Sequence, residues 1–212
     1  MSDADADPAA RKAALREQVR KARVAQPDKD GVSRAILDRV TARPEYAAAG
    51  TVLYYVDAGS EVRTRHALPA ALAAGKKIVV PYCIVETNEL ELFWLEAMAE
   101  LVEGAYKILE PAAGLRGLPR KQVRPEELDL VLVPGTAFDP HGGRMGQGKG
   151  YYDRLLTHAR PAAPLVALAF DCQIVPEIPV AVHDVFMDWV VTETTEYRGQ
   201  GRTPPLRSGE GG

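Results

Sequence analysis

The sequence predicts an α/β protein in which helices cover both faces of a mostly parallel sheet. Short, wholly apolar segments of strand length, such as residues 130–133 and 165–170, alternate along the chain with segments of helical periodicity. Strands without polar side chains are buried on both faces, as in parallel sheets between two layers of helices. The chain of 212 residues, 46% hydrophobic and 26% charged, has the composition of an ordinary globular domain.

The first half of the chain begins with a basic amphipathic helix. Residues 11–25 are strong helix formers and carry Leu15 and Val19 on one stripe. A second helix is predicted around residues 32–40, and the β-branched and aromatic run 51–56 is predicted to be a strand.

A helix and a strand come next. Residues 66–74 are predicted to be helical and to end at Gly75, which stands where a C-terminal cap is expected. Residues 77–80 are predicted to form a buried strand that stops at Pro81, because proline interrupts the hydrogen bonding of a sheet.

The second half supplies the centre of the predicted sheet. We expect strands at 90–95, 130–133 and 165–170, a helix at 151–158, and a short strand at 190–191 that closes the sheet. Ligands of such sheets bind beyond the carboxyl ends of the strands, so the loops after Val56, Val80 and Val133 are the candidates for chemistry.

Composition divides the chain into one domain and two loose ends. We expect a disordered lead at residues 1–9, a single domain at 10–197 and a disordered tail at 198–212, because the ends lack the apolar content that would offset the entropy of ordering.

The charge balance excludes some classes of partner. With 26 basic and 29 acidic residues the net charge is -3, which disfavours nucleic acid and anionic membranes as bulk partners. No stretch approaches the ~20 apolar residues of a membrane span, and the acidic start lacks the features of a secretory signal. We expect a cytoplasmic monomer, with a dimer as the alternative. Cys83 and Cys172 have no metal-site spacing and are expected to be buried free thiols.

The segment 134–154, after the predicted central strand, carries the strongest functional pattern. It contains six glycines, the cations Arg144 and Lys149, and the start of a predicted helix. Glycines let successive N–H groups converge on an anion, and a helix N-terminus favours negative charge, so the segment suits a polyphosphate.

The segment matches neither of two well-known nucleotide loops. Gly150 stands where a P-loop needs serine or threonine, and Gly146, Gly148 and Gly150 do not have the dinucleotide spacing. A flexible turn remains the alternative for the glycines alone. Asp153 is a candidate magnesium ligand, or it only complements the helix dipole.

The same segment resembles the signature of the 5-formyltetrahydrofolate cyclo-ligase family, also called 5,10-methenyltetrahydrofolate synthetase. The resemblance rests on Pro134-Gly135-x-Ala137-Phe138-Asp139 and on Gly143-Arg144-Met145-Gly146-x-Gly148-Lys149-Gly150-Tyr151-Tyr152-Asp153-Arg154. Shorter matches stand in the family's order at Lys12-Ala13-Ala14-Leu15-Arg16, at Glu61 and at His183-Asp184-x-x-Met187-Asp188.

The resemblance implies a three-layer α/β/α sandwich with a mostly parallel, Rossmann-like open sheet. It also implies an ATP- and magnesium-dependent closure of 5-formyltetrahydrofolate to 5,10-methenyltetrahydrofolate, with release of ADP and phosphate. Phosphoryl transfer to the formyl oxygen would give an iminophosphate, from which N10 displaces phosphate.

The resemblance further implies a set of site residues. Lys149 and Arg144 would be catalytic, and Asp153 and Asp184 would hold magnesium. The ATP site would comprise Lys12, Ala13, Ala14, Leu15, Arg16, Arg144, Met145, Gly146, Gln147, Gly148, Lys149, Gly150, Tyr151 and Tyr152. The folate site would comprise Val56, Glu61, Gln147, Gly148, Lys149, Gly150 and Tyr151. Without the resemblance, Lys12 and Arg16 would be interpreted as a solvated helix face and Glu61 as an exposed turn carboxylate.

Two other functions stay open at this point. A non-catalytic binding protein for phosphate or folate could keep the glycine segment, although Lys149 and both aspartates argue against such a loss of catalysis. A sugar-phosphate isomerase could use a related open sheet, and its reaction would need no nucleotide.

Overall fold

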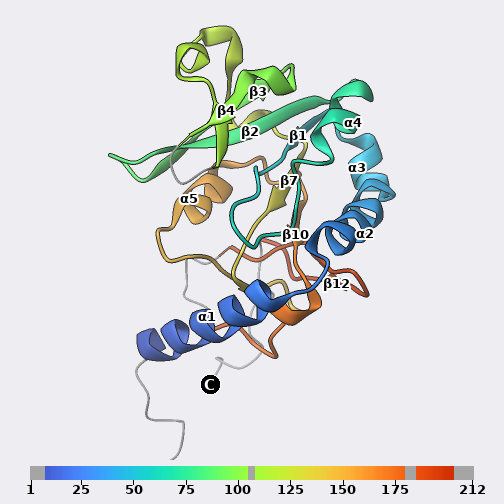
Figure 1. Cartoon of the computed structure of the whole chain (residues 1–212), viewed down its shortest axis with the longest axis vertical. Helices are drawn as coiled ribbons and strands as arrows, with labels where there is room; N and C mark the ends of the chain where they lie inside the picture. The colour runs from blue at the N-terminus through green and yellow to red at the C-terminus, as the bar shows by residue number, and fades with distance from the viewer. Residues whose placement is uncertain (1–7, 105–107, 180–184, 203–212) are drawn as a thin grey trace, which may run out of the picture.

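An eight-stranded sheet forms the centre of the protein (Figure 1), and its strand order is β12-β11-β10-β7-β1-β2-β3-β6. The computed structural model describes residues 8–104, 108–179 and 185–202. The strands are β1 (Thr51–Leu53), β2 (Lys77–Ile84), β3 (Glu89–Leu95), β6 (Gln122–Val123), β7 (Leu130–Val133), β10 (Leu165–Leu168), β11 (Trp189–Val191) and β12 (Glu196–Arg198). Two small sheets pair β4 (Leu101–Glu103) with β5 (Leu109–Pro111) and β8 (Ala137–Phe138) with β9 (Arg144–Met145).

The centre of the large sheet is parallel and its edges are antiparallel. Strands β2, β1, β7, β10 and β11 pair in parallel, in that spatial order. Beyond them, β3 and β6 extend one edge and β12 extends the other, all by antiparallel pairing. The short apolar runs therefore occupy the positions where both faces of a strand are covered.

Helices cover the two faces of the sheet. On one face, α2 (Lys29–Thr41), α3 (Pro44–Ala48) and α4 (Leu68–Ala73) pack against alternate residues of the strands, including Val52 and Leu130. On the other face, α5 (Tyr151–His158) packs against the intervening residues, including Val131. This alternation gives three layers, and the predicted fold class is confirmed.

Helix α1 (Pro8–Ala25) lies apart from these layers, beyond the ends of the strands in Figure 1. Its side chains contact the segments that follow β1 and β7, so it lies at the carboxyl edge of the parallel strands. The chain thus places a basic helix at the edge where an open α/β sheet binds ligands.

Most predicted elements are confirmed. The predicted bounds of β7 and α5 agree with the observed ones, and α1, α2, α4 and β3 lie where helices and a strand were expected. Strands β1 and β10 end earlier than predicted, but residues 54–56 and 169–170 remain buried.

Pro81 does not stop its strand, contrary to the prediction, because β2 continues to Ile84. Strand β1 pairs with β2 only as far as Val79, so Pro81 has a neighbour on one side, where it lies opposite Leu92 of β3. A proline is tolerated where no partner needs its missing N–H group.

The predicted closure of the sheet at residues 190–191 is wrong. Strand β12 adds to β11 as the outermost strand. Beyond it, the Arg202 guanidinium donates to the carbonyl oxygens of Arg160 at 2.8 Å and Ala163 at 2.7 Å. The packed chain therefore extends to Arg202, past the predicted domain boundary at residue 197.

The two cysteines are free thiols as expected, but Cys83 is exposed. Side chains alternate along β2, so Tyr82 lies in the core and Cys83 faces outward. Within the described ranges, no helix is long and apolar enough to cross a membrane.

A valine of the central strand tests the three-layer core. Val131 of β7 is 0% exposed and Val85 is 62% exposed, so the same truncation can be compared at both positions. We expect Val131→Ala to lower the free energy of unfolding by about 2 kcal/mol, through lost burial and a cavity, and Val85→Ala to change it little. Urea unfolding of both variants measures this, and equal losses would contradict the buried position of β7.

Candidate active site

The glycine-rich segment is anchored by a buried carboxylate. Asp139 Oδ1 accepts the N–H groups of His141 and Gly143, both at 2.9 Å, and Oδ2 accepts the N–H group of Ile178 at 2.9 Å. A Cβ atom at Gly142 would lie 2.4 Å from the carbonyl oxygen of Met187, so only glycine fits there. Part of the glycine content therefore builds the scaffold of the segment.

Residues 146–150 form the loop between β9 and α5, and their backbone N–H groups can bind an anion. These N–H groups donate no hydrogen bond to an acceptor among the described residues. Gly148 has φ of +94°, a conformation that favours glycine, and no side chain caps the start of α5. Unpaired N–H groups beside a helix N-terminus favour negative charge, as the sequence predicted.

Helix α1 approaches this loop through its predicted phosphate-binding face. The Arg16 Nε donates to the carbonyl oxygen of Gly146 at 3.1 Å, and Lys12 lies one turn earlier on the same helix. Leu15 packs against a small apolar cluster that includes Val19 and Met145. The predicted residues of α1 and of the loop are therefore brought together.

Arg144 and Asp153 form an ion pair at the base of the loop. The Arg144 side chain is only 4% exposed, and its Nη1 also donates to the carbonyl oxygen of Pro134 at 3.3 Å. Its Nε is buried and has no partner in the described chain. A buried guanidinium with a donor to spare can bind an anionic ligand.

Tyr152 carries a second buried polar atom without a partner. Its ring lies 5.9 Å from the guanidinium carbon of Arg144, and its hydroxyl makes no hydrogen bond to the described residues. Burial raises the pKa of Tyr152, and the charge of Glu61 acts in the same direction. The hydroxyl therefore stays protonated and can donate to a ligand.

Glu61 belongs to the loop after β1 and faces the glycine loop. Its Oε2 accepts the N–H group of Ala58 at 3.0 Å, and its carboxylate lies close enough to the Gln147 side chain for the two to interact. Burial raises the pKa of Glu61, and the hydrogen bonds and Arg23 act against this rise. The structure thus joins the two loops that were predicted to hold folate and phosphates.

Two other predicted site residues, Lys149 and Val56, differ in their exposure. Lys149 is exposed at the outer side of the loop, where its charge acts on Cys83 of β2. Val56 is buried in the core cluster on the side of α2. Their roles in catalysis and folate binding stay predictions.

Of the two predicted magnesium ligands, only Asp153 lies within the described residues. Asp153 is 39% exposed and pairs with Arg144, and Asp184 lies outside the described residues. Within the described ranges, no group of three or more His, Cys, Asp or Glu side chains could hold a metal ion. Magnesium is commonly held by one or two carboxylates together with substrate phosphates, and Asp153 fits that type of site.

Sequence reasoning missed Arg23. Its side chain is buried, with Nε 3.0 Å from Ser60 Oγ and Nη1 2.9 Å from the Gly135 carbonyl oxygen. Its place one turn after Val19, on the apolar stripe, was the available signal.

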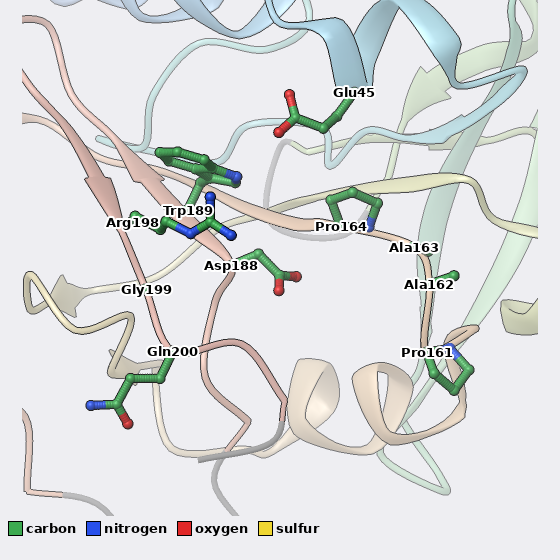
Figure 2. A pocket seen from close by; sticks show the side chains of 10 residues that line it. All are labelled: Glu45, Pro161, Ala162, Ala163, Pro164, Asp188, Trp189, Arg198, Gly199 and Gln200. Atoms are coloured by element: carbon green, nitrogen blue, oxygen red, sulfur yellow. The ribbon is translucent and has the colours of Figure 1, made fainter. Parts of the chain in front are cut away.

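Two hollows lie at opposite ends of the strands. One of about 540 Å³ adjoins the candidate site and is lined in part by Arg23, Ser60 and Gln147. The other, of about 320 Å³, lies at the amino ends of β10 and β11, where Figure 2 shows Asp188 and Trp189. The carboxyl edge, with its glycine loop and unpartnered buried atoms, is the better candidate for an active site.

Comparisons with known proteins agree with this arrangement. The sequence pattern of the 5-formyltetrahydrofolate cyclo-ligase family matches residues 8–193. The chain is 30% identical over 165 residues to the mouse 5-formyltetrahydrofolate cyclo-ligase, covering 74% of this chain and 80% of that protein. It is 35% identical over 148 residues to the Mycolicibacterium smegmatis protein of the same name, covering 67% and 73%.

A solved structure is also similar. The 5,10-methenyltetrahydrofolate synthetase of Aquifex aeolicus has a TM-score of 0.76 and 31% identity, covering 94% of this chain and 99% of that one. The likeness therefore extends over the whole sheet and its covering helices.

The anchoring carboxylate makes a testable contribution to stability. Asp139→Ala would remove the acceptor of three backbone N–H groups, of which those of Gly143 and Ile178 are buried, and we expect a loss of roughly 2–5 kcal/mol in the free energy of unfolding. Denaturant unfolding measures the loss, with exposed Asp38→Ala as the control. A loss as small as that of the control would show that the segment holds its path without Asp139.

Proposed function

The chain belongs to the 5-formyltetrahydrofolate cyclo-ligase family, and we propose on that premise that it cyclises 5-formyltetrahydrofolate to 5,10-methenyltetrahydrofolate in an ATP- and Mg²⁺-dependent reaction. The family and the names of its relatives make this chain an enzyme of folate metabolism. ATP, magnesium and the phosphorylated intermediate are the parts that we add. The predicted monomer and the cytoplasmic location stay predictions.

The hollow between the two loops carries the proposal. It is lined in part by Ala58 and Ser60 of the loop after β1 and by Gln147 of the glycine loop, so a folate held by one loop would lie beside a polyphosphate held by the other. Cyclisation needs this neighbourhood, because the formyl oxygen must reach the terminal phosphate of ATP. Holding two reactants in contact supplies much of the rate enhancement of such a reaction.

The proposed chemistry has two steps. The formyl oxygen attacks the γ-phosphorus, the bond to the ADP oxygen breaks, and an iminophosphate forms. N10 then attacks the activated carbon, the carbon–oxygen bond breaks with loss of phosphate, and the proton of N10 is released. Formamide oxygen is a poor leaving group, and phosphorylation converts it into a good one.

The residues of the chain supply charge and position. Arg144 and Lys149 would stabilise the negative charge on the transferring phosphoryl group. The N–H groups of residues 146–150, with Lys12 and Arg16, would bind the other phosphates. Glu61 would accept hydrogen bonds from the pterin, whose amino and ring N–H groups are paired donors, and Val56 would border the same ligand.

Asp153 and Asp184 would hold magnesium beside the phosphates. When bound, Mg²⁺ neutralises phosphate charge and holds the polyphosphate in one geometry. Because Arg144 already pairs with Asp153, the two cations would share this carboxylate with the ligand in place. Tyr151 and Tyr152 would lie at the start of α5, between the two substrates.

A direct assay tests the proposal. We expect the purified chain to convert 5-formyltetrahydrofolate into a product with the ultraviolet band of the methenyl compound, with ADP formed in equal amount. Omission of ATP, or chelation of magnesium with EDTA, is expected to abolish the band, and excess Mg²⁺ to restore it. Conversion that persists without ATP would contradict the proposal, as would intact substrate after long incubation.

Lys149 is tested by truncation. Lys149→Ala is expected to lower kcat by orders of magnitude with the thermal melting temperature unchanged, because the exposed lysine has no packing role and acts on the developing phosphoryl charge. A decrease of less than about tenfold, which is ~1.4 kcal/mol, would remove Lys149 from this role.

Substitution of Glu61 by glutamine is expected to weaken folate binding and to raise the free energy of unfolding at neutral pH. Glu61→Gln is expected to raise KM for the folate at least tenfold with little change in KM for ATP, since a carboxylate acceptor is lost. Burial raises the pKa of Glu61 above its ordinary value of 4.5, so the unfolded chain ionises first as the pH rises. The wild type therefore loses stability above about pH 4.5, and the variant does not.

The pH dependence separates this effect from other substitutions. The difference in free energy of unfolding between Glu61→Gln and the wild type is expected to be near zero at acid pH and to favour the variant at neutral pH. Exposed Glu86→Gln serves as the control. A difference that is constant with pH would contradict the assignment.

A further inference from the structure

Arg23 connects three segments that are far apart in the sequence. It lies in the last turn of α1 and is 6% exposed. Its Nε donates to the hydroxyl of Ser60, 37 residues away, and its Nη1 donates to the carbonyl oxygen of Gly135, 112 residues away. One side chain thus joins the helix of Arg16, the loop of Glu61 and the end of β7.

The Gly135 end of this connection is fixed from a second side. The Gln173 side chain is buried and donates to the carbonyl oxygens of Gly135 and Thr136, both at 3.0 Å. Gly135 is therefore held to the segment after β10 as well as to α1. These hydrogen bonds restrict the movement of Arg23 relative to the sheet. Because Arg23 also binds Ser60, they restrict the movement of the Ser60 loop as well.

The chemistry of these contacts is unusual for a buried cation. The two acceptors of Arg23, the Ser60 hydroxyl and the Gly135 carbonyl oxygen, are neutral, whereas a buried guanidinium is ordinarily paired with a carboxylate. Stability alone would favour an uncharged residue there or an exposed arginine. The charge is explained by what it faces, since it acts on the Glu61 carboxylate and on the Tyr55 hydroxyl.

Glu61 is surrounded by groups of both signs. Burial and the charge of Asp57 raise its pKa, and the charge of Arg23 lowers it. Asp57 itself pairs with Arg63 and Arg65, which have a nitrogen atom 3.4 Å and 3.6 Å from its Oδ2. Burial raises the pKa of the Tyr55 and Tyr152 hydroxyl groups, and the charge of Glu61 acts in the same direction, so both stay protonated. Removal of Arg23 would therefore leave the Glu61 carboxylate without the compensating charge of this arginine.

We infer that Arg23 is a positioning residue for the cyclisation, which holds the loop of Ser60 and Glu61 against α1 and supplies a positive charge to the Glu61 side of the folate site. The inference rests on the proposed function. In this role Arg23 would contact neither the formyl oxygen nor the γ-phosphorus. It acts through Glu61 on the folate side of the site, while Arg16 acts on the phosphate side of the same helix.

Three variants separate the two parts of this role. Arg23→Gln removes the charge, Arg23→Lys keeps the charge but cannot make the same two hydrogen bonds, and Ser60→Ala removes one acceptor and keeps the guanidinium. Exposed Lys21→Gln, on the same helix, is the matched control for loss of a cation. Steady-state KM for each substrate, kcat and the pH profile of kcat/KM are measured for all four and for the wild type.

The expected pattern is specific. Arg23→Gln raises KM for the folate at least tenfold, leaves KM for ATP within about threefold and moves the acid limb of the folate kcat/KM profile to higher pH. Arg23→Lys keeps the acid limb at its wild-type pH, and its KM for the folate lies between those of the wild type and Arg23→Gln. Ser60→Ala raises KM for the folate without moving the limb, and Lys21→Gln resembles the wild type.

Other outcomes overturn the inference. It fails if Arg23→Gln resembles Lys21→Gln, or if KM for both substrates rises equally while the acid limb stays in place. If Arg23→Gln does not fold, as judged by circular dichroism, Arg23→Lys and Ser60→Ala decide, and unchanged folate KM in both overturns it. A wild type without ATP-dependent conversion refutes the proposed function, whereas an active wild type with unaffected variants refutes this inference alone.

Discussion

The carboxylate of Asp139 holds the glycine segment on its path, and the position of every group in the candidate site depends on that path. Its two oxygens accept hydrogen bonds from three backbone N–H groups, and those of Gly143 and Ile178 would otherwise be buried without acceptors. The turn that it stabilises brings β9 back beside β8, which places Arg144 under the loop and Met145 against α1. The segment thus owes its shape to one carboxylate that binds backbone N–H groups.

The site gathers charges that a stable core would avoid. Arg144 and Arg23 are buried, Glu61 is held at a raised pKa, and Tyr152 keeps a hydroxyl without a partner. Each feature carries a cost that bound ligand can offset, because an anion would satisfy Arg144 and a donor would satisfy Glu61. Substrate binding should therefore stabilise this edge of the sheet more than its opposite edge.

Sequence patterns predicted what depends on neighbours along the chain. The bounds of β7 and α5 were predictable because an apolar run ends at Pro134 and helix formers begin after Gly150. The positive φ angles of Gly148 and Gly150 were to be expected from glycine itself, which acts through the local backbone. The pairing of Arg144 with Asp153 was not predicted, since either residue has an adequate solvated interpretation alone.

The remaining features depend on contacts between distant segments. Whether Pro81 ends a strand depends on how far β1 extends, and whether Arg23 is solvated depends on where Ser60 and Gly135 lie. The residue pattern of α1 predicts a helix, but it does not show that the loop of Ser60 covers Arg23. For the same reason Asp139 stood out only as part of a signature, without a role.

The attachment of α1 has a consequence for the order of events during synthesis. Helix α1 is translated before the strands of the sheet, and its partners Gly135 and Gly146 follow 112 residues after Arg23 and 130 residues after Arg16. An isolated helix of 18 residues with a largely charged surface is marginal in water, so α1 has no lasting structure of its own in the meantime. Helix α1 is therefore fixed only after residues 135 and 146 have been translated, and the carboxyl edge of the sheet is completed late in folding.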